Sequence, residues 1–427
     1  MNDSTLSRLS EFRQLKKEIR GSDRHLIVGI DVAKEKHHAF FGAATGRSFL
    51  RRLIFENNRE GFETLLHRAQ AIMTREGLDK VVFGVEPTAD YHKPLAEYLI
   101  NNGLSVVLVS NEAAKENRKT LDGRWDKNDT KDSANVADLI AQGKFLYYDL
   151  PAAPIRDLRH LLSLKRKLKS QEHSLRMRIR NHLVSQFFPE LDKYYGQREQ
   201  ENLAIVKWCL NPRQISAMDF GEFFQMVTSR DRGNVQRQRL QSIQRAARDS
   251  IGCEVSESTA FEAKMLVARL AGIRESIVEV DSRIAEVCRS LPGYESIVSI
   301  PGIGPAVAAV VLAAIGDPQR FSNTNQVLKL AGLDLSASRS GKNAVNVTPK
   351  LSKKGKAALR YALYQAALIA TSRNRYFVEY FSRLIAGRER EQGIKTKMRV
   401  KVAAKMLVIS WTLLKRGGTF QGEYLLN

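Results

Sequence analysis

The first third of the chain alternates between the two hydrophobic periods that mark strands and helices. HLIVGID and KVVFGVE are apolar runs that each end in an acid, which is typical of buried strands. HHAFFGA and SFLRRLIF follow the first run and predict two more strands in a meander, and SVVLVS predicts another. Apolar spacings of three and four over 59–76, together with KPLAEYLI and TKDSANVADLIAQG, predict helices, the last of which ends at Gly143. Three strands, then helix, strand, helix, strand and helix is the order of an RNase H-like α/β domain, although this order is not unique to that fold.

The rest of the chain is patterned for helices. Residues 154–188 predict one long helix, and further on apolar side chains step by four and three through about three and a half heptads. This seam predicts a coiled coil, whose partner is either 154–188 or another subunit. Its members are Leu266, Leu270, Ile273, Ile277, Val280, Ile284, Val287 and Leu291. The polar stretch 189–258 gives no assignment, and from Pro292 onward the chain is mostly helical and strongly basic.

These patterns divide the chain into four parts. We expect an N-terminal helical arm over 1–25 and the α/β domain over 26–150. A coiled-coil and linker region would occupy 151–291, and a mostly α-helical C-terminal domain 292–427.

The charge balance narrows the class of partner. The 427 residues include 68 Lys and Arg against 46 Asp and Glu, a net charge of +22. Such an excess favours a polyanion, and nucleic acid over an anionic membrane, because each neutralised phosphate releases counterions. The N-terminus has no apolar signal-peptide core, and the apolar stretch 306–315 is too short to span a bilayer. Three widely separated cysteines form no disulfide framework or zinc motif, so we expect a cytoplasmic protein with no membrane partner.

Four acids form the candidate metal site. Asp31 and Glu86 each end a predicted buried strand, at the sheet edge where ligands bind in open α/β sheets. Asp129 and Asp132 are three residues apart at a helix start, so both can face the same side. Acids brought together repel one another unless a cation lies among them, and oxygen ligands suit Mg²⁺ or Mn²⁺. Two such ions would stabilise the attacking and leaving oxygens in phosphodiester chemistry.

Each acid also has a simpler explanation. An Asp after a strand commonly forms a turn, and Asp129 by itself reads as a helix N-cap. Asp122, Asp126 and Asp138 lie nearby and compete for the third and fourth positions.

The C-terminal part contains two further candidate sites. In IPGIG, Gly302 and Gly304 precede an apolar helix, which is the form of a helix-hairpin-helix element that binds DNA backbone; a plain packing turn is the alternative. Ser340 lies among cations that would stabilise an attacking alkoxide and its transition state, although no general base accompanies it. These cations are Arg339, Lys342, Lys350, Lys353, Lys354 and Arg360. The alternative is a basic loop whose serines cap turns.

These segments together resemble the DEDD transposases of bacterial insertion sequences, relatives of the Piv/MooV-type DNA invertases. GIDVAKEKH, EPTADYHKPL and KNDTKDSANVADLIA carry the resemblance in the N-terminal half, around the four acids. IPGIGPAVAAVVLAAIGDPQRF, QVLKLAGLDLSASRSGK and LSKKGKAALRYAL carry it in the C-terminal half. The likeness covers about 26–148 and 292–415. Arg339 stands where the family often has a second Ser, which leaves Ser336 and Ser338 as lesser candidates.

The resemblance implies a RuvC-like N-terminal domain in which Asp31, Glu86, Asp129 and Asp132 bind Mg²⁺. It implies that Ser340, which precedes a glycine as in the family's pattern, attacks DNA and holds it as a phosphoserine. It further implies donor and target DNA, a guide (bridge) RNA, and a homo-oligomer, either dimer or tetramer. A RuvC-like junction nuclease that uses metal alone and a non-enzymatic nucleic-acid-binding protein are the alternatives.

Overall fold

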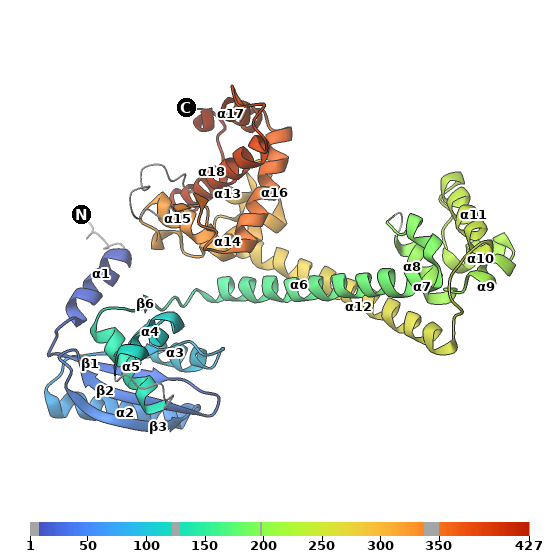
Figure 1. Ribbon diagram of the computed structural model, residues 1–427. Helices are drawn as coiled ribbons and strands as arrows, with labels where there is room; N and C mark the ends of the chain where they lie inside the picture. The colour runs from blue at the N-terminus through green and yellow to red at the C-terminus, as the bar shows by residue number, and fades with distance from the viewer. Residues whose placement is uncertain (1–7, 122–128, 197–198, 337–349, 427) are drawn as a thin grey trace, which may run out of the picture. The chain divides into compact units, whose positions relative to one another are not determined.

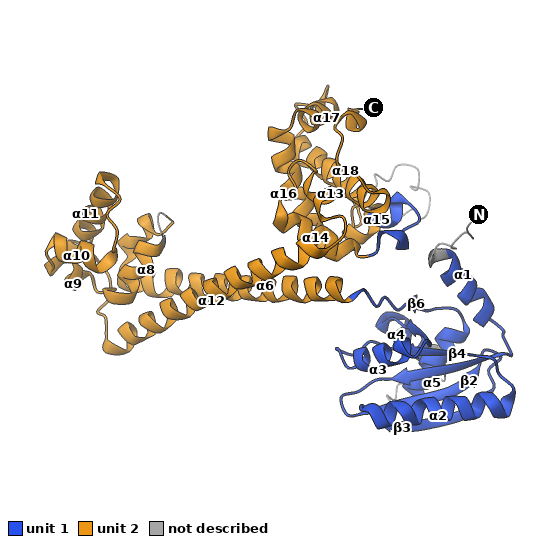
Figure 2. Cartoon of the chain, turned by 180° about the vertical axis from the view of Figure 1, so that it is seen from behind, with its two compact units in different colours: residues 1–152, 317–327 blue, residues 153–316, 328–427 orange. Residues whose placement is uncertain are grey.

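The computed structural model describes residues 8–121, 129–196, 199–336 and 350–426. The chain forms two compact units (Figure 2). The first contains residues 1–152 and 317–327, and the second contains 153–316 and 328–427. Each unit is described by itself.

A six-stranded mixed sheet forms the centre of the first unit, with strand order β3-β2-β1-β4-β5-β6. β1 and β4 are parallel, as are β4 and β5, whereas the other neighbours are antiparallel. The strands are β1 (His25–Asp31), β2 (Lys36–Ala43), β3 (Ser48–Glu56), β4 (Lys80–Val85), β5 (Ser105–Leu108) and β6 (Leu146–Tyr147). This mixed sheet is compatible with the RNase H-like fold expected for 26–150.

Helices cover both faces of the sheet (Figure 1). One face packs on α2 and α3 through a core that includes Ile30, Leu65 and Leu95, and the other packs on α5 through a core that includes Ile27 and Ile140. Alternate residues of β1 therefore enter different cores, as the pleat of a strand requires. The helices of this unit are α1 (Arg8–Ile19), α2 (Arg59–Glu76), α3 (His92–Asn101), α4 (Asn111–Leu121) and α5 (Asp129–Ala141), followed later in the chain by η3 (Pro318–Arg320).

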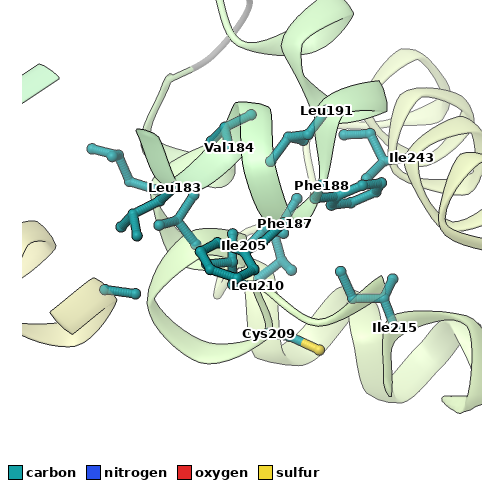
Figure 3. Packing of buried hydrophobic residues seen from close by; sticks show 14 of the residues in the cluster. Leu183, Val184, Phe187, Phe188, Leu191, Ile205, Cys209, Leu210, Ile215 and Ile243 are labelled. Carbon is teal, nitrogen blue, oxygen red and sulfur yellow. The ribbon is translucent and has the colours of Figure 1, made fainter. Parts of the chain in front are cut away.

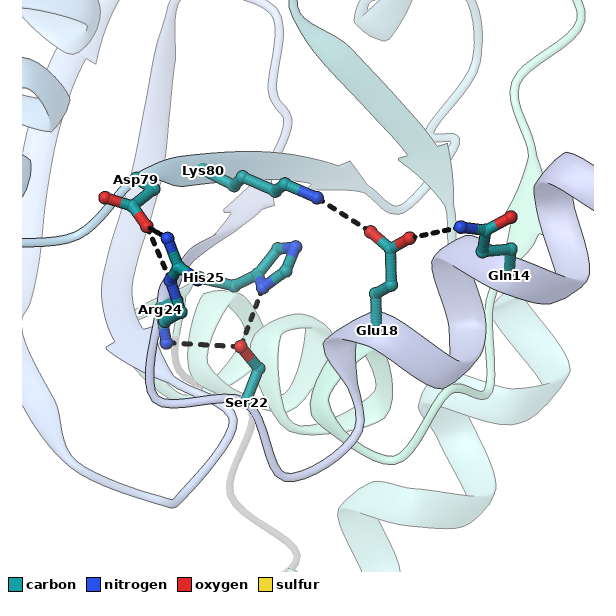
Figure 4. Close-up of polar contacts among 7 residues, drawn as sticks. All are labelled: Gln14, Glu18, Ser22, Arg24, His25, Asp79 and Lys80. Atoms are coloured by element: carbon teal, nitrogen blue, oxygen red, sulfur yellow. Dashed lines mark hydrogen bonds and ion pairs between the residues drawn. The ribbon is translucent and has the colours of Figure 1, made fainter.

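The N-terminal helix α1 is tied to the sheet by polar contacts (Figure 4). Glu18 accepts hydrogen bonds from Lys80 Nζ and Gln14 Nε2, each at 2.9 Å. Arg24 pairs with Asp79 just before β4. Ile19, at the end of α1, is fully buried in the α5-side core, so the arm is packed as well as hydrogen-bonded.

A long helical hairpin begins the second unit. α6 (Ala153–Arg178) continues through a π-helical segment, η1 (Ile179–Val184), into α7 (Ser185–Phe187) and η2 (Pro189–Tyr194). α12 (Glu257–Ser290) returns beside α6 (Figure 1). The seam residues Leu270, Ile277, Val280 and Ile284 are buried. The predicted seam is thus the inner face of α12 over these positions, and within this chain α12 packs against α6.

A small helical module joins the two long helices. It consists of α8 (Glu199–Trp208), α9 (Pro212–Ala217), α10 (Phe220–Val227) and α11 (Asn234–Arg248). Its own core is built from η1, the module helices and the start of α12, with Leu183, Phe188, Ile205 and Ile243 fully buried (Figure 3). The stretch 189–258, which the sequence left unassigned, is therefore folded over its described residues.

Three of the remaining helices, α14, α17 and α18, pack against α16. In the whole described part of the protein, none of the helices is long and apolar enough to cross a membrane. The elements are α13 (Tyr294–Val298), α14 (Pro305–Ile315), α15 (Thr324–Ala331), β7 (Leu335–Ser336), β8 (Lys350–Leu351), α16 (Ala357–Arg373), α17 (Arg375–Ile385), α18 (Ile394–Arg416) and α19 (Glu423–Leu426).

Candidate functional site

Asp31 and Glu86 lie side by side at the carboxyl edge of the sheet. The parallel register of β1 and β4 pairs Ile30 with Val85, so the next residue of each strand reaches the same level. Neighbouring strands are about 4.8 Å apart, and paired residues of parallel strands point to the same face. Both acids are half-buried. The register therefore places two carboxylates next to each other, as their positions after two buried strands predicted.

The same face of the sheet carries α5. A Cβ added to Gly29 would lie 2.5 Å from Ala137 N and closer still to Ser133 O, and one added to Gly84 would collide with Ile140. Glycine at both positions lets α5 approach the backbone of β1 and β4. Asp31 comes two residues after Gly29 on β1, and Glu86 comes two residues after Gly84, directly past the end of β4. Strand alternation therefore directs both acids to the face that α5 covers.

α5 runs antiparallel to β1. Arg20, which precedes β1, donates a hydrogen bond to the carbonyl of Gln142, which follows α5, at 3.0 Å. The C-terminal end of α5 thus lies at the start of β1, and its N-terminal end lies toward the carboxyl edge. This direction brings the first turns of α5, which carry Asp129 and Asp132, to the edge that holds Asp31 and Glu86. Asp129 is the first residue of α5, and its side chain lies outside the described residues.

Asp132 is deeply buried and paired with a cation. Its side chain is 3% exposed, and Oδ1 lies 2.7 Å from Nε of Arg118 on α4. The contact is an ion pair without hydrogen-bond alignment, because neither atom has a hydrogen-bond partner. A buried carboxylate is costly unless a cation accompanies it. Asp132 therefore needs positive charge at this place, and Arg118 supplies it in this structure.

The competing acids separate into two groups. Asp138 accepts hydrogen bonds from Asn117 and Gln142, at 2.7 and 2.6 Å, and therefore has a structural role between α4 and α5. Asp122 and Asp126 lie outside the described residues.

Among the side chains that the structure describes, no group of three or more acids, histidines or cysteines is close enough to hold a metal ion. The described acids share an edge and a face but are not gathered around one point.

Two residues beside the acids were not identified from the sequence. Arg118 lies in a polar helix that was not predicted, and His38 is the cross-strand partner of Asp31 in β2. His37, next to it, is a core residue: its ring lies against Phe55 and Phe62, and burial lowers its pKa. Strand register cannot be read from a sequence pattern, so the neighbour of Asp31 was not predictable.

The C-terminal candidates surround a short two-stranded ribbon. β7 and β8 pair Leu335 with Leu351. Ser340, Arg339, Lys342 and Ser338 lie outside the described residues, and of Ser336 only the backbone is described. Lys353 and Lys354 are exposed just after β8.

The glycines of IPGIG differ in their surroundings. Gly302 has a φ of +88° and lies so close to the carbonyl of Ala366 on α16 that a side chain would not fit. This close packing against α16 explains why a glycine occupies position 302. Gly304 is exposed at the N-cap of α14, with nothing within 4 Å of an added Cβ. Of the two, Gly304 is the one that a ligand could approach.

Comparison with known proteins shows the family. A family model for IS110-type DEDD transposases matches residues 28–189, and the model of the transposase IS116/IS110/IS902 family matches residues 294–382. The first match begins within β1, covers the rest of the sheet and contains the four candidate acids, and the second contains IPGIG and Ser340. The chain belongs to this family of insertion-sequence transposases, enzymes that cut and rejoin DNA. This membership disfavours the non-enzymatic alternative.

Individual relatives are distant. The insertion element IS116 uncharacterized 44.8 kDa protein of Streptomyces clavuligerus is 22% identical over 92% of this chain and 96% of its own length. The putative transposase y4uE of Sinorhizobium fredii is 25% identical over 44% of this chain and 50% of its own. The pilin gene-inverting protein of Moraxella bovis is 26% identical over 34% of this chain and 45% of its own. The family's DEDD domain points to the use of a divalent metal.

Proposed function

We propose that this transposase cuts and rejoins DNA with two sets of residues: Asp31, Glu86, Asp129 and Asp132 would hold Mg²⁺ or Mn²⁺, and Ser340 would be the nucleophile. The observation that carries the proposal is the register of β1 and β4, which sets Asp31 beside Glu86 under the N-terminal half of α5. A pair of adjacent carboxylates on one sheet face, with a buried third on the covering helix, is a donor set of hard oxygen ligands.

Carboxylates suit such an ion, although the described members of the set share an edge and a face of the sheet without being gathered around one point. Asp132 Oδ1 is buried against Arg118 Nε without a hydrogen bond, so a metal ion would take the place of the guanidinium as the cation that this carboxylate requires. When bound, the ion would supply positive charge to stabilise the developing charge on the phosphate and the leaving oxygen. The protein's own contribution is to hold the acids on rigid elements, since β1, β4 and α5 interlock at Gly29 and Gly84.

The serine step conserves the phosphodiester bond energy. Oγ of Ser340 would give up its proton and form a bond to the scissile phosphorus while the bond from phosphorus to a deoxyribose oxygen breaks. The departing oxygen would take up a proton and become a hydroxyl, so no proton is gained or lost overall. The reverse attack by a hydroxyl of the partner strand rejoins DNA and restores the serine. Lys353 and Lys354, exposed at the end of β8, would attract the phosphate backbone.

We extend the proposal to a guide RNA and to a homo-oligomer, dimer or tetramer, on the basis of the family resemblance. The net charge of +22 supports binding of more than one nucleic acid strand. Purification under high salt, followed by nuclease digestion and sequencing of the bound material, tests the RNA. A preparation that recombines DNA without any copurifying RNA contradicts this part of the proposal.

A suicide DNA substrate tests the nucleophile. The parent protein should form a covalent adduct that survives denaturation, and mass spectrometry should place it on Ser340, while Ser340→Ala forms none. Ser336→Ala is the matched control and should retain the adduct. Cleavage by Ser340→Ala with no adduct in the parent would instead support the metal-only junction nuclease.

DNA inversion is a second candidate activity. It is favoured by the likeness to the pilin gene-inverting protein of Moraxella bovis over part of the chain. A plasmid with two sites in inverted orientation separates the two outcomes, because inversion changes the restriction pattern without releasing a circle.

A further inference from the structure

A pocket of about 320 Å³ opens beside the β7–β8 ribbon, and no residue of it belongs to the acid site. α16 forms one wall with Ala357, Arg360, Tyr361 and Tyr364. α18 forms the facing wall with Val400 and Ala403, and the chain around β8 closes the pocket with Leu333, Leu351 and Lys353. Its size is at the lower end of the range for small-molecule sites, which suits a ligand as large as a single nucleobase.

The lining combines aromatic rings, an apolar floor and cations. Tyr361 and Tyr364 are three residues apart on α16 and so share one face of the helix. Tyr361 is 68% exposed, although it is a large ring with apolar surface to bury. Arg360 and Lys353 contribute two positive charges, and the described residues that line the pocket include no acid. Aromatic rings next to cations are the combination that binds an unstacked base and its phosphate.

The cations are held in place by the backbone. Arg360 Nη1 donates to the carbonyls of Ala331 and Lys353, at 2.7 and 3.5 Å. Lys353 has a φ of +53°, a conformation that costs energy for a residue with a side chain. The backbone N–H of Lys353 donates a hydrogen bond to the carbonyl of Gly332 at 3.1 Å, which fixes this conformation. Glycine at position 332 allows the two backbones to approach, because a Cβ on Gly332 would lie 2.7 Å from the carbonyl carbon of Lys353.

We propose that this pocket binds one nucleobase of the substrate DNA, turned out of the helix, with its ring on Tyr361 and its phosphate near Lys353. The inference depends on the protein acting on DNA and does not require Ser340 to be the nucleophile. Leu351 of the pocket belongs to β8, the strand that pairs with β7, and Lys353 follows β8. A base held here would anchor the DNA beside the β7–β8 ribbon.

The test measures base binding directly, with the full-length protein and a single-stranded DNA that contains one 2-aminopurine. Stacking should quench the fluorescence, and Tyr361→Ala should weaken binding of this DNA about tenfold. Tyr361→Phe keeps the ring and should bind as the parent does. Tyr424→Ala is the matched control, because Tyr424 is 73% exposed on α19 and does not line the pocket. Thermal melting should show the three variants folded, since both side chains are mostly exposed.

Salt dependence separates stacking from charge. The loss in Tyr361→Ala should persist from low to high salt, whereas Lys353→Ala should reduce the slope of affinity against salt by about one counterion. Equal losses in Tyr361→Ala and Tyr424→Ala, or tighter binding of the same sequence as RNA than as DNA, would overturn the proposal. Ser340→Ala should keep the quenching, so a failure of the serine mechanism would leave this result intact.

Discussion

Arg118 on α4 holds its guanidinium Nε 2.7 Å from Oδ1 of Asp132 on α5, at a carboxylate that is almost completely buried. The pair joins the two helices of one face of the sheet. It also provides the positive charge that a metal ion would provide if Asp132 served as a ligand. Arg118 is 27% exposed in its side chain, so it can reach solvent or substrate when it leaves Asp132.

Replacing Arg118 should therefore make stability depend on metal. In Arg118→Ala, the buried carboxylate loses its cation, and the free energy of unfolding should fall by about 2–3 kcal/mol in the presence of a chelator. Millimolar Mg²⁺ should recover most of this loss, because the ion takes the place of the guanidinium. Urea unfolding with and without Mg²⁺ measures both effects. Lys119→Ala, which removes an exposed partner of Glu116, should change little in either condition. A loss that Mg²⁺ leaves unchanged would contradict a metal at Asp132.

Asp31→Asn and Glu86→Gln should remove DNA cleavage while leaving the sheet folded. A bound metal ion contributes several kcal/mol to transition-state stabilisation, so loss of a ligand should lower the cleavage rate about a hundredfold or more. Gel assays of strand cleavage and calorimetric titration with Mn²⁺ measure the rate and the metal affinity. Asp79→Asn is the control, because Asp79 is an acid at the opposite end of β4 that pairs with Arg24. Normal cleavage by both variants would exclude these acids from the site.

Gly29→Ala and Gly272→Ala should have opposite effects on stability. A Cβ at Gly29 would collide with the backbone of α5, so this variant should lose about 1–3 kcal/mol and part of its metal affinity. Gly272 lies in α12 with nothing within 4 Å of an added Cβ, so its replacement should stabilise the helix by about 0.5–1 kcal/mol. Urea titrations of the two variants measure both changes. A neutral Gly29→Ala would show that α5 can move away from the sheet without cost.

Stability should fall with rising pH above about pH 9 through two buried thiols. Burial raises the pKa of Cys209 and of Cys288 to about 11, from the usual 9.0. Between these values the unfolded chain has lost the thiol protons and the folded chain keeps them. The free energy of unfolding therefore decreases as pH rises, by about 1–2 kcal/mol per thiol near pH 10.5. Urea unfolding from about pH 8 to pH 10.5 measures the slope.

A double variant, Cys209→Ala with Cys288→Ala, provides the control for groups other than the thiols. Its unfolding free energy should decrease less steeply over the same range. Equal slopes in parent and variant would mean that the thiols are solvated in the folded protein. Cys253 is exposed and should react first with a thiol reagent at neutral pH.

Five strands of the sheet were predictable, because β1 and β4 are continuous apolar runs and β2, β3 and β5 carry clusters of apolar residues. The two-residue β6 was too short to show a pattern. α4 was missed because its sequence, NEAAKENRKTL, is mostly polar: among the described side chains of this helix only Ala114 is completely buried. The module over 199–248 was missed because its short helices share a core that no single segment displays. Phe223 and Leu240, for example, are buried against one another's helices and not along one periodic face.

The candidate site was predictable only in part. The positions of Asp31 and Glu86 after two buried strands sufficed to place them at one edge, because parallel strands end together. The pairing of Asp132 with Arg118 and the pocket beside Tyr361 depend on contacts between distant segments. No periodicity encodes such contacts, since each involves two elements whose relative placement is set by tertiary packing.

The hairpin of α6 and α12 constrains the order in which the second unit folds. Glu172 and Arg274 are 102 residues apart in sequence yet hydrogen-bonded at 3.1 Å, and Lys165 pairs with Asp281 further along. Closing so long a chain costs entropy before any contact between the two helices is gained. The module's core includes η1 at the end of α6 and the start of α12, so its formation would bring these ends together and shorten that search. The long helices would then associate from their module end, and mutations in the module's core should slow folding even where the hairpin itself is unchanged.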